Sequence, residues 1–265
     1  MARDSNTTVE RIDPGETPAL ELALHVSRYQ FVSPLVAGRS VLDAGCGVGY
    51  GSGEFTAGPP AEYFGVDRSA DAIRLAQRRY AAPHRRFLVA DVVALPFAAG
   101  QFDIVLSFEV VEHLREVDRY LAELRRMLRP GGTCVVSTPN KRWFSGDTTT
   151  PPNPYHMREY EAPEFAELLA RHFSDVRMLG QHEGTRARVV RSVERRYGRF
   201  LDQMGVRRLR RVVPVSLLTW VHQSAVSLVS RWRGVSPAVI EASDYEFTPD
   251  NVHDARVLLG ICRAP

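Results

Sequence analysis

The amino-acid sequence predicts an α/β fold in which helices cover both faces of a doubly wound, mostly parallel sheet. Short apolar runs alternate with segments of helical periodicity from residue 19 to residue 181. The runs are almost continuously apolar, as strands buried on both faces are, and a glycine-rich turn follows the first of them. The chain has 265 residues, 44% of them hydrophobic and 25% charged, which excludes the disordered and collagen-like classes.

Apolar spacing and turn residues predict the first elements. Residues 1–18 are polar and are expected to form a flexible arm, whereas the apolar spacing of Ala19–Val36 predicts a helix. The alternation of strands and helices begins after it. Its expected order is strand Ser40–Gly45, a helix around Gly49–Phe55, strand Ala61–Asp67, helix Ala70–Tyr80 with Ser69 as its N-cap, and strand Arg85–Asp91.

The second part of the chain continues the alternation and then interrupts it. A turn is expected at residues 129–132 (Arg-Pro-Gly-Gly), and a polar, proline-rich loop at Ser145–Pro154. The remaining expected elements are strand Phe102–Phe108, helix Asp118–Leu128, strand Thr133–Pro139, helix Pro163–His172, strand Val176–Gln181 and a final strand Ala255–Ala264.

These elements divide the chain into four expected parts. They are an N-terminal arm and helix (1–36), a core of alternating strands and helices (37–182), a basic, mostly helical insertion (183–250) and the final core strand (251–265). The segment Glu183–Gly234 contains twelve arginines and three acidic residues. Its local charge is therefore +9, in a chain of net charge +3. Apolar stripes such as Val212, Val215 and Leu218 favour a lid or a homo-oligomer contact over binding of nucleic acid or another polyanion.

The spacing of the cysteines and the hydropathy of the chain indicate in which cellular compartment the protein is expected. Cys46, Cys134 and Cys262 form no Cys-x-x-Cys pair, so we expect neither a zinc ribbon nor a disulfide framework. The polar first residues do not resemble a signal peptide. The longest apolar stretch, Val212–Val229, contains Pro214 and His222, so no membrane span is expected. We therefore expect a cytoplasmic protein.

The turn after the first strand is rich in glycine. Gly45, Gly47 and Gly49 stand at alternate positions, where they allow a sharp turn and a ligand lying against bare backbone. The dinucleotide pattern Gly-x-Gly-x-x-Gly fails, because its sixth position is Tyr50 or Ser52, and no phosphate-binding Gly-Lys-Ser/Thr follows.

Two acidic residues end the next two strands. Asp67 lies 22 residues after Gly45, where a carboxylate can accept hydrogen bonds from both ribose hydroxyls, and Asp91 lies where an adenine amino group would. Because ligands bind outside the carboxyl ends of parallel strands, these positions converge on one crevice.

This ordered set of motifs resembles class I S-adenosylmethionine-dependent methyltransferases over roughly Ser40–Gln181 and again at the last strand. The resemblance rests on VLDAGCGVG, GVD, AD and SFEVVEHL. The alternative is a dinucleotide-binding or other Rossmann-like domain. It implies a Rossmann-like, seven-stranded sheet with an antiparallel last strand. The cofactor, S-adenosyl-L-methionine, would be bound by Asp43, Gly45, Gly47, Gly49, Asp67, Asp91, Val92 and Phe108.

A Glu-x-x-Glu-His sequence follows the fourth strand. On a helix, Glu109, Glu112 and His113 would share a face, and a cation such as Mg²⁺ between the carboxylates would relieve their repulsion. The motif resembles ubiquinone-biosynthesis O-methyltransferases and the methyltransferase of small-RNA terminal ribose. That resemblance implies Glu109, Glu112, His113 and His156 as metal ligands, with His113 and Glu112 catalytic. The alternatives are His113 as a metal-free general base and a purely structural role.

The acceptor is expected at the loop after the fifth strand. The acidic-Pro-Pro-aromatic motif of DNA amino-methyltransferases is absent, whereas Trp143, Tyr155 and Arg158 suit a sugar or a flat aromatic ring. TPN…NPYHMREY resembles bacterial sugar and polysaccharide methyltransferases. The sequence therefore predicts O-methylation of a sugar or oligosaccharide hydroxyl, assisted by Mg²⁺. The alternatives are an RNA ribose, a phenol or quinone precursor, and an inactive cofactor-binding protein.

Overall fold

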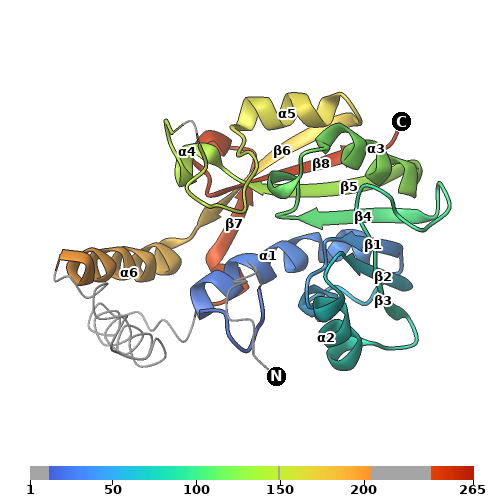
Figure 1. Ribbon diagram of the computed structural model, residues 1–265, viewed down its shortest axis with the longest axis horizontal. Coiled ribbons are helices and arrows are strands. Elements are labelled where there is room, and N and C mark those ends of the chain that lie inside the picture. The colour runs from blue at the N-terminus through green and yellow to red at the C-terminus, as the bar shows by residue number, and fades with distance from the viewer. Residues whose placement is uncertain (1–11, 149, 204–239) are drawn as a thin grey trace, which may run out of the picture. The chain divides into compact units, whose positions relative to one another are not determined.

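The computed structural model describes residues 12–148, 150–203 and 240–265 (Figure 1). Within these ranges eight strands form one sheet in the order β3-β2-β1-β4-β5-β8-β6-β7. The strands are β1 (Ser40–Ala44), β2 (Glu62–Asp67), β3 (Arg85–Val89), β4 (Phe102–Phe108), β5 (Leu128–Pro139), β6 (Ser174–Glu183), β7 (Tyr245–Thr248) and β8 (Val257–Arg263). Neighbours from β3 to β5 are parallel, whereas β8 is antiparallel to β5 and β6. The doubly wound sheet with an antiparallel last strand is confirmed.

Helices cover both faces of the sheet, as the apolar patterns predict. The larger core cluster joins the sheet to α3 (Val117–Met127) and α5 (Ala162–Ala170), whose buried residues include Leu121, Leu124 and Phe165. On the other face lie the C-terminal part of α1 (Ala19–Val36) and α2 (Ala70–Tyr80). A Cβ on Gly49 would meet Ala76 of α2 at 2.8 Å, so the glycine turn itself packs on this helix.

The structure corrects three expected elements. The helix expected around Gly49–Phe55 is a short 3-10 turn, η1 (Tyr50–Gly53). β5 begins at Leu128, and the expected turn at residues 129–132 is a bulge in that strand, with Phe102 opposite Leu128 and Ile104 opposite Thr133. The expected insertion begins as the helix α6 (Thr185–Gln203), but it also contains β7, which makes eight strands rather than seven.

Two compact units share the chain. Among the described residues, one unit comprises 12–16, 29–182 and 247–265, and the other comprises 17–28, 183–203 and 240–246. In the second unit, the Tyr245 hydroxyl donates to the Leu20 carbonyl at 2.6 Å, and Arg191 pairs with Glu183. The boundaries expected from sequence remain a prediction, and most of the basic insertion, with Val212–Val229, lies outside the described residues.

Two further features are the state of the cysteines and the hydropathy of the helices. Cys46, Cys134 and Cys262 are buried thiols that form no disulfide. Of the helices that the structure describes, none has the length and hydropathy needed to cross a membrane.

Candidate active site

The glycine turn leaves the carboxyl end of β1 where the sheet order reverses, between β1 and β4. Gly45 has φ 91°, and a Cβ on it would lie 2.4 Å from Val110 Cγ2, so glycine allows the segment after β4 to approach. Gly47, with φ 56°, differs, because a Cβ there would meet nothing within 4 Å. The open side of the turn therefore has room for a ligand beside Gly47.

The acidic residues of the neighbouring strands lie around this turn. Asp67 ends β2, and its Oδ2 accepts a hydrogen bond from the Gly47 amide at 3.0 Å. Its Oδ1 accepts from the Ser69 amide at 2.8 Å, so the carboxylate joins the turn to the start of α2. After β3, Asp91 is exposed and Val92 is buried. The structure thus brings Asp67 to the glycine turn and places Asp91 and Val92 beyond the next strand.

Asp43 is a buried carboxylate just before the turn. The hydroxyls of Tyr29 and Tyr63 donate to its Oδ2 at 3.0 and 2.6 Å, whereas its Oδ1 accepts no hydrogen bond from the part of the chain that the structure describes. Burial raises the pKa of Asp43 to about 6, and the two tyrosines oppose that rise. Phe108, at the end of β4, packs its ring edge-to-face on Tyr29 at 5.0 Å. Sequence reasoning did not identify either tyrosine, since neither belongs to a motif.

The segment after β4 differs from the expected helix. Glu109 has a left-handed φ of 56°, and only Val111–His113 form a helical turn, the 3-10 turn η2. The Glu109 carboxylate accepts from the Ser137 hydroxyl at 2.9 Å. The expectation that Glu109 shares a helix face with Glu112 and His113 is therefore wrong, because the chain changes direction at Glu109.

Three of the four expected metal ligands nevertheless converge. Among the described residues, ligand atoms of Glu112, His113 and His156 lie within 4.8 Å of one another, and Glu109 is outside this group. Glu112 is fully buried, and its Oε2 accepts from the Thr138 hydroxyl at 3.1 Å. His113 Nδ1 lies 3.0 Å from the Tyr155 carbonyl, which can only accept, so this nitrogen carries the hydrogen. The other nitrogen of His113, Nε2, is then the ring's acceptor atom.

His156 is held from both sides of its ring. Its Nδ1 lies 2.8 Å from Glu159 Oε1, and its Nε2 lies 3.0 Å from the Asn153 amide nitrogen. The turn that carries it is bound to η2, since the amides of Met157 and Arg158 donate to the Glu112 carbonyl at 2.7 and 3.2 Å. Neither Glu159 nor Asn153 was expected, although the spacing His-x-x-Glu could have indicated the first.

This donor set fits a divalent cation. A carboxylate and two imidazoles, each with its second nitrogen hydrogen-bonded to an oxygen acceptor, are the usual surroundings of protein-bound metals. The Asn153 amide lies against His156 Nε2 and would have to move away before an ion could bind that histidine nitrogen. The same geometry without an ion leaves His113 as a base beside a buried carboxylate, so both sequence-based alternatives remain.

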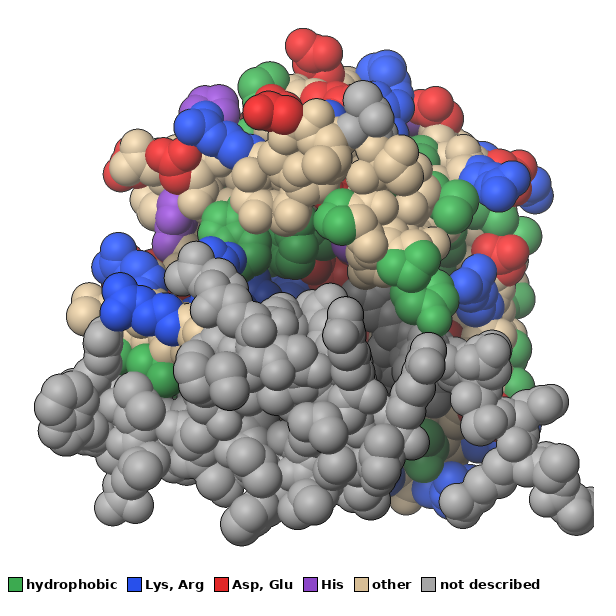
Figure 2. Space-filling model, turned by 60° about the vertical axis from the view of Figure 1, so that its left-hand side comes forward, with side chains coloured by type: hydrophobic (Ala, Val, Ile, Leu, Met, Phe, Trp, Pro, Cys, Tyr) green, Lys and Arg blue, Asp and Glu red, His purple; other side chains and the backbone are tan. Residues whose placement is uncertain are grey.

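Two of the expected acceptor residues, Tyr155 and Arg158, contact this group through their backbone atoms. Trp143 lies on the short helix α4 (Lys141–Phe144), with the Arg256 guanidinium 5.0 Å from its ring centroid. Arg158 pairs with Glu164 of α5, which engages its guanidinium. Phe144, Tyr155 and Met157 are three of the five large hydrophobic side chains exposed in the described ranges. Figure 2 shows hydrophobic side chains exposed between polar ones on the face it turns forward.

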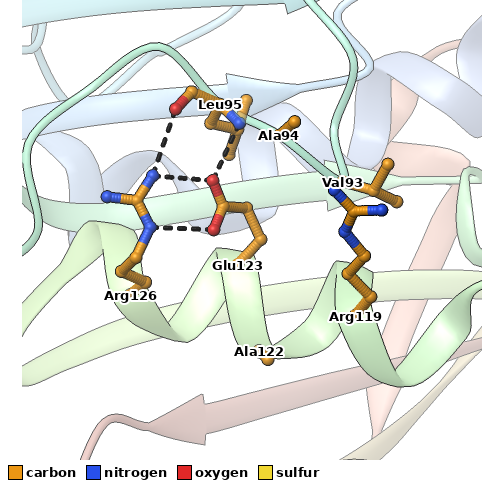
Figure 3. Close-up of a pocket in the computed structure, with 7 residues that line it drawn as sticks. All are labelled: Val93, Ala94, Leu95, Arg119, Ala122, Glu123 and Arg126. Carbon is orange, nitrogen blue, oxygen red and sulfur yellow. Dashed lines mark hydrogen bonds and ion pairs between the residues drawn. The ribbon is translucent and has the colours of Figure 1, made fainter.

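A separate hollow of about 520 Å³ lies between α3 and the segment after Val92 (Figure 3). Glu123 and Arg126, one turn apart on α3, pair at 2.6 Å on one side of it, and both also bind the backbone of Leu95. None of the expected cofactor, metal or acceptor residues lines it, so we assign it no part in the chemistry.

Comparisons with known proteins agree with this architecture. A crystal structure of a methyltransferase from Thermotoga maritima superposes with a TM-score of 0.58 at 13% identity, covering 93% of this chain and 92% of that one. The cyclase SpnF superposes with a TM-score of 0.56 at 20% identity, covering 96% and 86%. At these identities the likeness shows the fold alone, and that fold also hosts chemistry other than methyl transfer.

Sequence comparisons identify the core. A "probable S-adenosylmethionine-dependent methyltransferase" of Mycobacterium tuberculosis is 37% identical over 175 residues, or 66% of this chain, and the chain covers 62% of that protein. A phthiotriol/phenolphthiotriol dimycocerosates methyltransferase of Mycobacterium ulcerans is 33% identical over 192 residues, covering 68% and 64%. The family model described as a methyltransferase domain matches residues 42–136. The matched core of this chain is therefore similar to a methyltransferase domain, and the chain spans less than two thirds of the length of these two relatives.

Proposed function

We propose that this protein transfers the methyl group of S-adenosylmethionine to a hydroxyl oxygen, with a divalent metal ion held by Glu112, His113 and His156. The observation that carries the proposal is the convergence of these three side chains within 4.8 Å. The metal-ligand turn is joined directly to the cofactor crevice, because β4 ends at Phe108 and η2 begins three residues later. A hydroxyl bound at the ligands would thus lie close to the methyl donor.

The cofactor would occupy the crevice around the glycine turn. Gly47 has open space beside it, and the unpaired Oδ1 of Asp43 is an acceptor for a ligand's polar hydrogen. Asp67 would bind the ribose, and Asp91 with Val92 would contact the adenine, in keeping with the motif order. This assignment is supported by the placement of these residues at the carboxyl ends of β1, β2 and β3.

The residues of the acceptor side would supply alignment and proton removal. A sulfonium methyl group is already activated, so the protein must place the acceptor oxygen in line with it and take up the hydroxyl proton. A bound divalent cation lowers the pKa of a hydroxyl that it contacts. His113 would do this work through Nε2, because its Nδ1 carries a hydrogen, and a Glu112 oxygen lies within 4.8 Å of a His113 ring nitrogen. If no ion binds, His113 is the general base.

The donor set favours a transition-metal ion over the expected Mg²⁺. That expectation rested on two carboxylates, but Glu109 lies outside the converging group. The remaining ligands are two imidazole nitrogens and one carboxylate. Imidazole suits ions such as Zn²⁺ and Fe²⁺, whereas Mg²⁺ prefers oxygen ligands and water. We infer that Mn²⁺ or Zn²⁺ binds here more tightly than Mg²⁺.

For the acceptor we propose a hydroxyl on an apolar carrier, a lipid or glycolipid. The exposed side chains of Tyr155 and Met157 flank His156 in the chain, Phe144 is exposed on α4, and all three favour apolar contacts. The Mycobacterium ulcerans relative, by its name, acts on phthiotriol dimycocerosates. A soluble sugar is the second candidate, because residues 138–160 carry the motif that resembles sugar methyltransferases.

The proposal is tested by turnover of the full chain after removal of metal with EDTA. S-adenosylmethionine is supplied with long-chain alcohols or glycolipids in detergent, with oligosaccharides, or with an RNA carrying a 3′ ribose. The proposal expects methylation of a hydroxyl that EDTA abolishes and Mn²⁺ or Zn²⁺ restores. Turnover indifferent to metal would assign His113 as a metal-free base, and turnover of sugars alone would replace the apolar acceptor. Absence of S-adenosylhomocysteine binding would refute the whole assignment.

A further inference from the structure

Glu159 is a buried carboxylate within the segment NPYHMREY, and sequence analysis gave it no role. Its side chain is 1% exposed, and its two oxygens have different partners. Oε1 lies 2.8 Å from His156 Nδ1, and Oε2 accepts a hydrogen bond from the Ser145 hydroxyl. Burying a carboxylate is costly unless its partners compensate. Because of this cost, we look for a role for Glu159 in its contact with His156.

The contact determines which nitrogen of His156 carries the hydrogen. A carboxylate accepts, so His156 Nδ1 carries the hydrogen, and Nε2 keeps its lone pair. The Asn153 amide nitrogen, 3.0 Å from Nε2, is a donor and agrees with this tautomer. The negative charge on Glu159 also makes the imidazole a stronger ligand, as a carboxylate behind a metal-binding histidine does.

Glu159 is not needed to hold the turn in place. The Met157 and Arg158 amides donate to the Glu112 carbonyl, and His113 binds the Tyr155 carbonyl, so other bonds fix residues 155–158 on η2. Loss of the Glu159 carboxylate would therefore release the His156 ring before it released the backbone. This separation distinguishes a role in orienting the ring from a role in folding.

The second oxygen extends this arrangement to the acceptor side. Ser145 ends α4, which carries Trp143 and Phe144. Through its two oxygens Glu159 joins the ring of His156 to the end of the helix that carries the expected acceptor contacts.

We propose that Glu159 is a positioning residue that fixes the Nδ1–H tautomer of His156 and directs Nε2 to a divalent metal ion shared with Glu112 and His113. The proposal rests on the proposed function for its metal but not for its tautomer. It makes Glu159 necessary for metal affinity and unnecessary for cofactor binding.

The test compares Glu159→Gln and Glu159→Ala with the full-length chain. Titration with Mn²⁺ alone gives the metal affinity, and ¹⁵N NMR of the histidines gives the tautomer of His156. We expect Glu159→Ala to weaken Mn²⁺ binding by about 10- to 100-fold, as loss of such a partner does. Glu159→Gln, which keeps an acceptor oxygen and the same shape, should weaken it less and keep the tautomer. Glu167→Gln, an equal charge change at an exposed position of α5, is the matched control and should change neither.

Three outcomes separate this proposal from the proposed function. Mn²⁺ binding that is equal in wild type, Glu159→Gln and Glu159→Ala would overturn the role of Glu159 and leave the metal site intact. A wild-type His156 in the Nε2–H tautomer would also overturn it. If wild type binds no metal, the proposed metal site fails, and the role of Glu159 toward the metal fails with it even where the tautomer is as expected. The Gln variant keeps the test decisive if Glu159→Ala does not fold.

Discussion

On the cofactor side of the site, each expected residue follows a regular strand: the glycine turn follows β1, Asp67 ends β2, Asp91 comes shortly after β3 and Phe108 ends β4. On the acceptor side, Glu112, His113 and His156 lie in short turns held by backbone hydrogen bonds, and Glu159 contacts the ring of His156. The first set is positioned by the sheet and the second by contacts between loops. We therefore expect substitutions on the two sides to separate cofactor affinity from turnover.

The largest expected effect belongs to the acceptor side. His113→Ala should lower turnover about 100- to 10,000-fold, because it removes the group that binds the metal or takes the proton. Affinity for S-adenosylhomocysteine, measured by calorimetry, should stay within about twofold of wild type, since the proposed cofactor contacts follow β1 and β2. An equal loss of affinity and turnover would show that the two sides are one unit.

Asp43 should give the cofactor side a pH dependence of its own. Its pKa is raised from 3.8 to about 6, so the folded state holds the proton more tightly than the unfolded state. The resulting stability is present below about pH 4 and is lost as the pH rises through 6, by about 3 kcal/mol. Chemical denaturation from pH 4 to 8 should show this slope in wild type and its loss in Asp43→Asn. Parallel pH profiles would contradict the assignment.

Substitution of Gly45 tests whether the glycine turn of the cofactor side packs tightly against Val110, which precedes the metal-ligand turn of the acceptor side. Gly45→Ala should destabilise the protein by about 2 kcal/mol, because it combines a left-handed φ with a clash against Val110. Gly131→Ala is the matched control, since its φ is also positive but a Cβ there meets nothing within 4 Å. Equal losses for the two variants, by urea unfolding, would show that Val110 moves aside freely.

The smallest expected effect concerns the start of α2. The Ser69 hydroxyl accepts from the Ala72 amide at 3.3 Å as the N-cap, so Ser69→Ala should cost about 1 kcal/mol of stability. The Ser69 amide, which binds Asp67, is kept, so affinity for S-adenosylhomocysteine should not change. A loss of affinity without a loss of stability would mean that the hydroxyl itself contacts the cofactor.

The same contrast explains what could be predicted from the sequence. Strands and their ends were predictable because burial on both faces leaves continuous apolar runs, and glycines and aspartates mark where those runs stop. The left-handed residue Glu109 leaves no such mark, so a helix was expected where the chain turns. Glu159 acts through a histidine that itself was assigned by resemblance, and no periodicity connects the two. β7, only four residues long, is too short to be distinguished from a loop.

The most direct test of the metal-assisted reaction is a calorimetric titration of Mn²⁺ into the full chain saturated with S-adenosylhomocysteine, alongside Glu112→Gln. We predict that wild type binds one ion and that the variant, still saturated with S-adenosylhomocysteine, binds it at least about tenfold more weakly. Absence of binding in wild type, or equal binding in the two proteins, would contradict a metal centre at Glu112, His113 and His156.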